Sequence, residues 1–181
     1  MLGDVTRLPA ETFEELALPL FDQLYNFARW LTQDADEAED LVQETFAKAL
    51  RGFSGYQAGT NFRAWMYRIL RNSFLTSKSG LNSMVAFDEE EYETSAAGMS
   101  STPESLLIAQ ADRKMVQQAL QELPVPFREI LLLCEVEEMS YQEIAQTLSV
   151  PMGTVMSRLF RARKALRNLL EREFQGDAHA V

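Results

Sequence analysis

The sequence is short of the residues that build most catalytic and metal sites. Its 181 residues include one cysteine and one histidine, which excludes an internal disulfide and any site of paired cysteines or histidines. The histidine, His179, lies in a polar C-terminal stretch without suitable partners nearby. A glycine-rich phosphate loop and a spaced set of serine, histidine and aspartate are also missing. The sequence therefore predicts a protein that is not an enzyme, binds no metal and needs no cofactor.

Long hydrophobic runs are missing as well. No stretch approaches the roughly 18 apolar residues of a membrane span. The first 15 residues carry acids and no apolar signal segment. The single cysteine, Cys134, follows an apolar run and is expected to fill the core of a protein in a reducing compartment. Together these features predict a cytoplasmic protein that does not insert into a membrane.

Glycine and β-branched runs are few, whereas alanine, leucine, glutamate and arginine are abundant, and this composition favours helix. Apolar residues recur at helical spacing in several segments. These segments are 13–31 (interrupted at Pro19), 36–51, 61–76, 104–123 and 127–136. Residues 77–103 lose the periodicity and are rich in serine, glycine, threonine and acids. We expect an all-α chain of two small helical domains, 11–79 and 104–174, joined by a flexible acidic linker at 80–103.

The most informative stretch runs from residue 140 to residue 166. Ser140 and Glu143 have the three-residue offset of a capping box, and Pro151 suits the first turn of a second helix. Six apolar residues of that helix form a stripe that we expect to be buried: Met152, Val155, Leu159, Ala162, Leu166 and Leu169. The arginines fall mostly off this stripe. The pattern predicts a helix-turn-helix that fits the DNA major groove, while the simpler alternative is a solvated basic face on a helical hairpin.

The charge distribution supports contact with DNA despite a net charge of −10. Six basic residues lie in 158–172, and four basic residues without any acid lie in 61–78, whereas acids concentrate in 11–44 and 88–93. Two basic islands in an acidic chain suggest two contacts with DNA and a basic protein partner elsewhere. Because the acidic linker can compete with phosphate for the arginines, we expect the free protein to bind duplex DNA poorly.

Three blocks in this order resemble the extracytoplasmic-function (ECF) sigma factors, the compact branch of the bacterial sigma-70 family. The blocks are Asp36–Phe46, Asn61–Asn72 and Glu122–Lys164. The resemblance implies a protein that binds RNA polymerase core, directs it to specific promoters and helps to open the DNA. It also implies a stress or envelope response controlled by an anti-sigma factor, which in some cases holds the protein at the inner membrane.

The resemblance also implies site residues. The first block matches the helix that docks on the clamp helices of the largest polymerase subunit, and its exposed positions here are Asp40, Gln43 and Glu44. The candidates for the minus-ten promoter element are Arg63, Tyr67, Arg68, Arg71, Asn72 and Lys78. The candidates for the minus-thirty-five element are Ser157, Arg158, Phe160, Arg161 and Lys164. Phe62 and Trp65 are assigned to the core.

Two departures from the family pattern and two other functions remain. Met156 stands where many members carry lysine or arginine, and residues 73–83 hold one basic residue, Lys78, where relatives are often arginine-rich. A free-standing helix-turn-helix repressor or activator would explain the C-terminal half, but not the second basic island or the acidic helix before it. A protein-interaction adaptor would make no contact with DNA.

Overall fold

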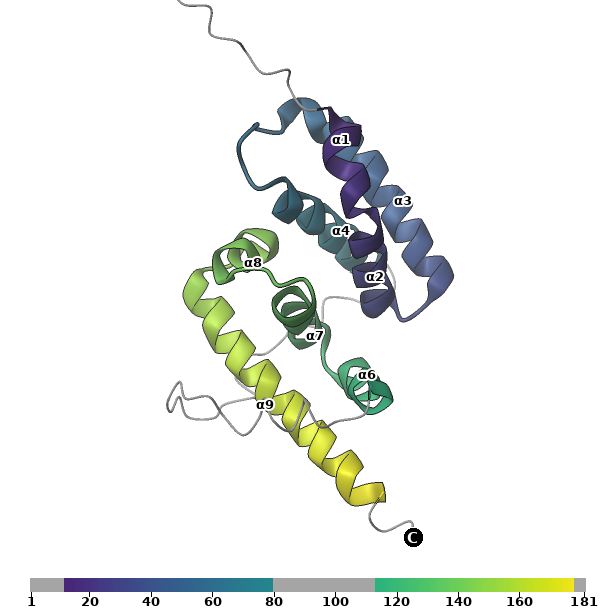
Figure 1. Cartoon of the computed structure of the whole chain (residues 1–181), viewed down its shortest axis with the longest axis vertical. Coiled ribbons are helices and arrows are strands. Elements are labelled where there is room, and N and C mark those ends of the chain that lie inside the picture. Colours follow the sequence, from purple (N-terminus) through teal and green to yellow (C-terminus); the bar gives the residue numbers. More distant parts are fainter. Residues whose placement is uncertain (1–11, 80–112, 178–181) are drawn as a thin grey trace, which may run out of the picture.

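A computed structural model describes residues 12–79 and 113–177, and every regular element in these ranges is helical. The N-terminal lobe contains α1 (Phe13–Ala17), η1 (Leu18–Leu20), α2 (Phe21–Thr32), α3 (Ala35–Gly52), η2 (Phe53–Gly55) and α4 (Phe62–Ser79). The C-terminal lobe contains α6 (Arg113–Glu122), α7 (Val125–Leu131), η4 (Leu132–Val136), α8 (Tyr141–Leu148) and α9 (Met152–Asp177). Figure 1 shows the two lobes one above the other. The all-α prediction is confirmed, and the predicted linker lies outside the described residues.

Local sequence signals set the helix boundaries of the N-terminal lobe. Thr12 and Glu15 form a capping box at the start of α1. Pro19 falls in the 3₁₀ turn η1, where the sequence predicted the interruption. Gln33 adopts a left-handed conformation at φ 62° and ends α2, and the Asp34 side chain then accepts a hydrogen bond from the backbone of Glu37 to start α3. The apolar faces of α2, α3 and α4 meet in the core of this lobe.

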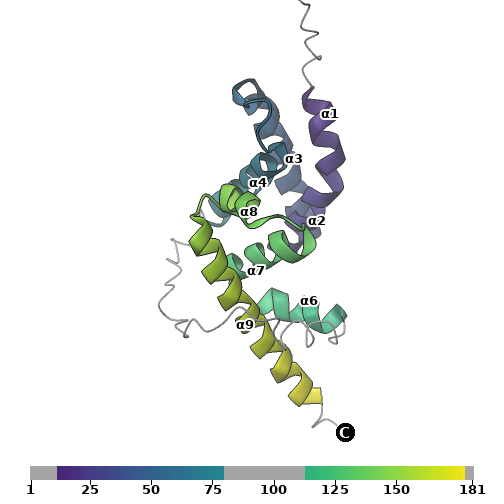
Figure 2. The same cartoon turned by 60° about the vertical axis from the view of Figure 1, so that its left-hand side comes forward.

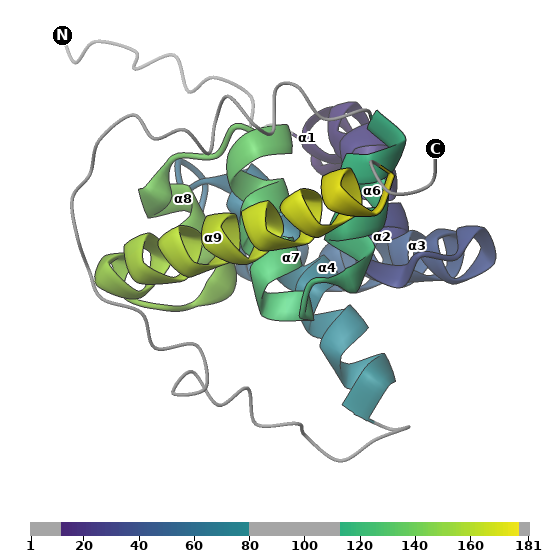
Figure 3. The same ribbon diagram turned by 90° about the horizontal axis from the view of Figure 1, so that it is seen from below.

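The C-terminal lobe contains the helix-turn-helix that the sequence predicted. The capping box of Ser140 and Glu143 begins α8, and Ser149, left-handed at φ 57°, makes the turn toward α9. The buried stripe of α9 consists of Val155, Leu159, Ala162, Leu166 and Leu170. Figure 3 shows how α9 lies across α7.

Two positions of the expected stripe need correction. Met152 is 51% exposed and is the first residue of α9. Leu170 takes the buried place expected for Leu169, which is half-buried. At 100° per residue, Leu170 lies about 40° from Leu166 around the helix, whereas Leu169 lies about 60° from it on the other side.

Replacing Ser140 by Ala should lower the free energy of unfolding by about 1 kcal/mol, because the Glu143 backbone N–H at the start of α8 loses its acceptor. Chemical denaturation followed by circular dichroism measures this change. Ser157→Ala is the matched control, since its hydroxyl bonds only to the Thr154 carbonyl within α9. Its effect should stay below about 0.5 kcal/mol, and equal losses for the two variants would contradict the capping role.

The two lobes pack directly against each other, with α4 beside α8 and α2 beside α7 (Figure 2). Arg128 of α7 is buried at this junction. Its guanidinium donates to the carbonyls of Leu120, Gln121 and Leu123 at 2.8–3.0 Å, and to the Leu31 carbonyl of the other lobe at 3.4 Å. Burial lowers the pKa of Arg128. The Arg128 guanidinium thus satisfies the carbonyls at the end of α6 and also contacts the end of α2. These hydrogen bonds stabilise the contact between the lobes.

Candidate nucleic-acid interface

Three of the minus-ten candidates share one face of α4. Arg63, Tyr67 and Arg71 follow one another at four-residue steps, so their side chains lie along one side of the helix. The structure turns this side toward the C-terminal lobe, where carboxylates meet all three residues. We call these three residues the α4 row.

Arg71 forms the most buried ion pair of the described residues. Its Nε and one terminal nitrogen donate to the two carboxylate oxygens of Glu129 at 2.8 and 3.0 Å, a bidentate geometry. The side chains are 18% and 1% exposed. Burial raises the pKa of the Glu129 carboxyl, and the positive charges of Arg71 and Arg158 oppose that shift. Removing Arg71 would leave only the charge of Arg158 to offset the burial of the Glu129 carboxylate.

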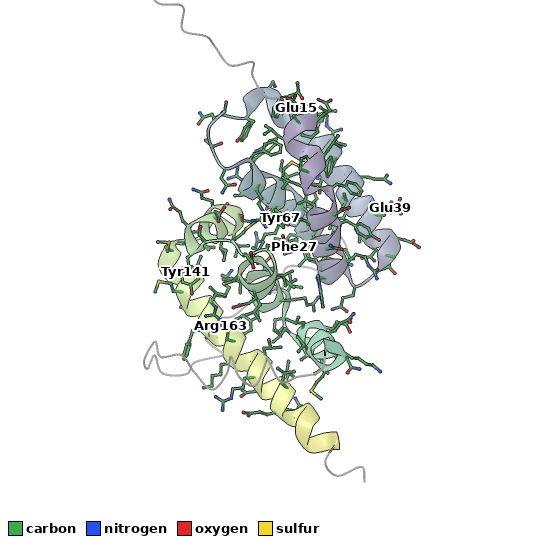
Figure 4. The ribbon with its side chains drawn as sticks, in the orientation of Figure 1. Glu15, Phe27, Glu39, Tyr67, Tyr141 and Arg163 are labelled. Atoms are coloured by element: carbon green, nitrogen blue, oxygen red, sulfur yellow. The ribbon has the colours of Figure 1, made fainter. Side chains whose placement is uncertain are left out.

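The other two members of the α4 row converge on Glu137. Arg63 donates to the Glu137 backbone carbonyl at 2.6 Å and to its carboxylate at 3.1 Å. The Tyr67 hydroxyl donates to the same carboxylate, and its ring packs edge-on against Phe27 with the centroids 5.2 Å apart. Burial, and next the hydrogen bond and charge of Glu137, raise the pKa of Tyr67 well above its usual value. Figure 4 shows Tyr67 and Phe27 at the junction of the lobes.

Tyr67, one of the minus-ten candidates, lies in the core: its side chain is fully buried. Tyr67 lies beside the arginines on α4, and the C-terminal lobe covers its side chain. In this arrangement Tyr67 cannot contact DNA. The remaining minus-ten candidates lie at the surface. Arg68 and Asn72 are exposed, and Lys78 pairs with Glu37 at 2.9 Å.

A pocket of about 570 Å³ opens beside the α4 row. Its lining includes Tyr56, Asn61, Trp65, Arg68 and, from the other lobe, Gln146. Trp65 is half-buried and lies 5.2 Å from Tyr56 between ring centroids, so its assignment to the core holds only in part, whereas Phe62 is buried. A pocket with aromatic walls and a guanidinium suits a planar, unstacked base. Sequence reasoning missed it because three of its walls come from separate segments.

The minus-thirty-five candidates lie on the first turns of α9. Ser157 and Phe160 are exposed, while Arg161 and Lys164 are half-exposed. Arg161 donates to the Ser157 carbonyl at 3.3 Å. Arg158 is half-buried, and its charge acts on Glu129 at the lobe junction. The structure thus keeps four candidates on the outer face of α9 and turns Arg158 partly inward.

The expected polymerase-docking residues share an exposed face of α3. Asp40, Gln43 and Glu44 are all exposed, whereas Leu41 and Val42 point into the core. Glu44 pairs with Lys48 one turn later at 2.6 Å. Such an exposed pair contributes little to stability, so this face is free to exchange it for an intermolecular contact.

Two family models match the chain: sigma-70 region 2 over residues 19–81 and sigma-70 region 4 over residues 113–166. The chain is 37% identical to the ECF RNA polymerase sigma factor SigE of Mycolicibacterium smegmatis, over 99% of this chain and 68% of that protein. It is 33% identical to the RNA polymerase sigma-H factor of Pseudomonas aeruginosa, over 92% of this chain and 90% of that protein. The chain belongs to the ECF sigma factors of the sigma-70 family.

The solved structures agree with this assignment. The sigma factor RpoE of Bartonella quintana, in complex with the anti-sigma factor NepR, is 30% identical with a TM-score of 0.68, covering 88% of this chain and 96% of that one. CnrH, in complex with the cytosolic domain of CnrY, is 25% identical with a TM-score of 0.63. The region 2 match spans α2–α4 and the region 4 match spans α6 to most of α9. The protein is therefore a transcription initiation factor and not an enzyme.

Within the described residues, no group of three or more histidine, cysteine, aspartate or glutamate side chains is arranged to hold a metal ion. Over the same ranges, no helix of this sigma factor is both long and apolar enough to cross a membrane. Its single cysteine, Cys134, is half-buried, and burial raises the pKa of the thiol.

Proposed function

We propose that the acidic face of α3 docks this sigma factor on the clamp helices of the largest polymerase subunit. The proposed region 2 domain is 11–79, the linker is 80–103, and the proposed region 4 domain is 104–174. Asp40, Gln43 and Glu44 meet basic groups of the polymerase, since an exposed acidic helix face is complementary to a basic one. The observation that carries this proposal best is the separation of roles: α3 presents acids, while α4 and α9 present arginines.

The minus-ten element is contacted by α4 and the pocket beside it. Arg63, Arg68 and Arg71 supply positive charge along one strand, Asn72 and Lys78 extend this surface, and an extruded base enters the pocket next to Trp65. The outer face of α9 reads the minus-thirty-five element through Ser157, Phe160, Arg161 and Lys164, with Arg158 at its margin.

The free protein is closed, so these surfaces must first be released. Glu129 and Glu137 accept hydrogen bonds from Arg71 and Arg63 in the way a phosphate would. The sequence suggested that the acidic linker competes with phosphate for these arginines. Among the described residues, Glu129 and Glu137 are the carboxylates that bind them. Docking on polymerase separates the lobes and exposes the α4 row.

An anti-sigma factor controls the protein, in a stress or envelope response in the cytoplasm. RpoE of Bartonella quintana was solved with the anti-sigma factor NepR, and CnrH was solved with the cytosolic domain of CnrY. Each of the two structures covers 88% of this chain. An anti-sigma factor that anchors the complex at the inner membrane would hold the closed sigma factor there until the signal arrives.

Transcription in vitro with purified polymerase core tests the function. Core plus this protein should start transcripts at defined positions on a set of genomic fragments, whereas core alone or the protein alone should not. Sequence-specific binding of the free protein to duplex DNA, without any initiation by the mixture, would instead favour a free-standing repressor.

Replacing Arg161 by Ala should weaken binding of the holoenzyme to its promoter by about 1–3 kcal/mol and relax the preference at one base pair, if this side chain contacts a base. Competition binding on promoters with single substitutions in the minus-thirty-five element measures both effects. Arg158→Ala should behave similarly, with an added loss of stability because Arg158 is half-buried near Glu129. Arg172→Ala, an exposed control further along α9, should change neither quantity. Unchanged affinity and selectivity in both the Arg158 and Arg161 variants would contradict the groove assignment.

A further inference from the structure

The outer face of α9 carries large apolar side chains that its packing does not use. Met152, Met156 and Phe160 are 51%, 44% and 38% exposed and stand at successive four-residue steps. Single exposed apolar residues are ordinary on a protein surface. Three of them stand in one row on α9, which has more arginines than any other described helix. Such a row indicates a contact that the described residues do not make.

This row runs beside a polar row. One turn after Phe160 the apolar row ends in the half-exposed Lys164, and next to it Gly153, Ser157 and Arg161 form the second row. A side-chain carbon added at Gly153 would meet no atom within 4 Å, so the surface is open there. The two rows together make a convex helical face with apolar groups along one side and hydrogen-bond donors along the other.

We infer that Met156 and Phe160 read the C5-methyl groups of thymines in the minus-thirty-five element. The thymine methyl is the apolar group that bases present in the major groove, and Phe and other apolar side chains contact it there. A convex helix with a basic margin fits a groove lined by phosphates, whereas a helix of a protein partner would need a concave apolar surface. This inference rests on the proposed function and adds a determinant of promoter choice to it.

The helix geometry limits which bases can be read. Base contacts come from the N-terminal part of a recognition helix, and both residues fall in the first three turns of α9. A recognition helix lies along the major groove, so residues three to four apart contact successive bases, as in zinc fingers. Met156 and Phe160 therefore reach thymines in neighbouring base pairs. A lysine or arginine at position 156 would contact phosphate or guanine instead, so this methionine should give the protein a different base preference.

The test removes single methyl groups from the DNA. A promoter is first selected by the holoenzyme, and each thymine of its minus-thirty-five element is then replaced by deoxyuridine, which differs only in lacking the methyl. The wild-type holoenzyme should lose about threefold to fivefold in affinity at one or two positions, the amount expected for one buried methyl. In the Met156→Ala holoenzyme, deoxyuridine should no longer lower the affinity at one of these positions. In the Phe160→Ala holoenzyme, it should no longer lower the affinity at the other. Met156→Leu should largely keep the methyl effect that Met156→Ala removes.

The controls separate this inference from the proposed function. Val136→Ala changes an exposed apolar residue outside α9 and should leave every methyl effect intact. If no deoxyuridine weakens binding although Arg161→Ala does, or if the methyl effects persist in both alanine variants, the methyl reading is overturned and the groove assignment stands. If neither Arg161 nor the sequence of the minus-thirty-five element matters, the proposed function itself fails.

Discussion

Replacing both Glu129 and Glu137 by Gln should open the free protein and raise its affinity for promoter DNA by about tenfold or more. The substitutions keep the shape of the side chains but remove the charges that face Arg71 and Arg63. Removing one partner of a buried ion pair typically destabilises a protein by about 3–5 kcal/mol, because the other charge stays buried. If the lobes separate, the arginines return to water and this cost is avoided. Because only the open form binds DNA, the observed affinity rises with its population. Fluorescence anisotropy on a labelled promoter duplex measures the change.

A second pair of substitutions controls for net charge. Glu135 and Glu138 lie in the same segment of the chain and are exposed, and within the described residues neither forms a hydrogen bond or ion pair with the N-terminal lobe. Glu135 pairs instead with Arg163 of α9 at 2.6 Å. Replacing both by Gln changes the charge by the same amount and should raise the DNA affinity less than twofold. An equal rise in the two double variants would mean that long-range repulsion, and not the lobe contact, restrains DNA binding.

Reversing the charges of Asp40 and Glu44 to lysine should reduce affinity for polymerase core by about 100-fold or more, because like charges then face each other across the interface. The fold should tolerate the change, since both residues are exposed and surface substitutions seldom exceed about 0.5 kcal/mol. Equilibrium binding of a labelled sigma factor to core measures the affinity, and thermal unfolding measures the stability.

The matched control for charge is the same reversal at two other glutamates. These are Glu122, the last residue of α6, and Glu171, in the C-terminal part of α9. This control reversal should leave polymerase binding within about threefold of wild type. If the Asp40 and Glu44 variant unfolds, these residues belong to the structural framework. If it stays folded and binds core normally, the docking face lies elsewhere.

The helices could be predicted from the sequence because their signals are local. The capping box of Ser140 and Glu143, the break at Pro19 and the apolar periodicity of α9 each involve residues within a few turns of one another. The helix-turn-helix followed directly from them.

The junction of the lobes could not be predicted in this way. Arg71 and Glu129 are 58 residues apart, and Arg63 and Glu137 are 74 apart. Nothing in helical periodicity selects one distant carboxylate as the partner of a given arginine. Tyr67 was therefore a candidate for the minus-ten site, whereas the packing of the second lobe buries it in this structure. The pocket beside Trp65 was missed for the same reason, because Gln146 reaches it from the other lobe.

The distance between the lobes tests the central claim most directly. The single cysteine allows a clean design: Cys134→Ser removes it, and cysteines at the exposed positions Gln23 of α2 and Asn168 of α9 receive a fluorophore pair. Energy transfer should report one short distance in the free protein, and a longer one both in the holoenzyme and in the Glu129→Gln, Glu137→Gln variant. The same distance in all three samples, or a long distance in the free protein, would contradict the closed state and its release by polymerase.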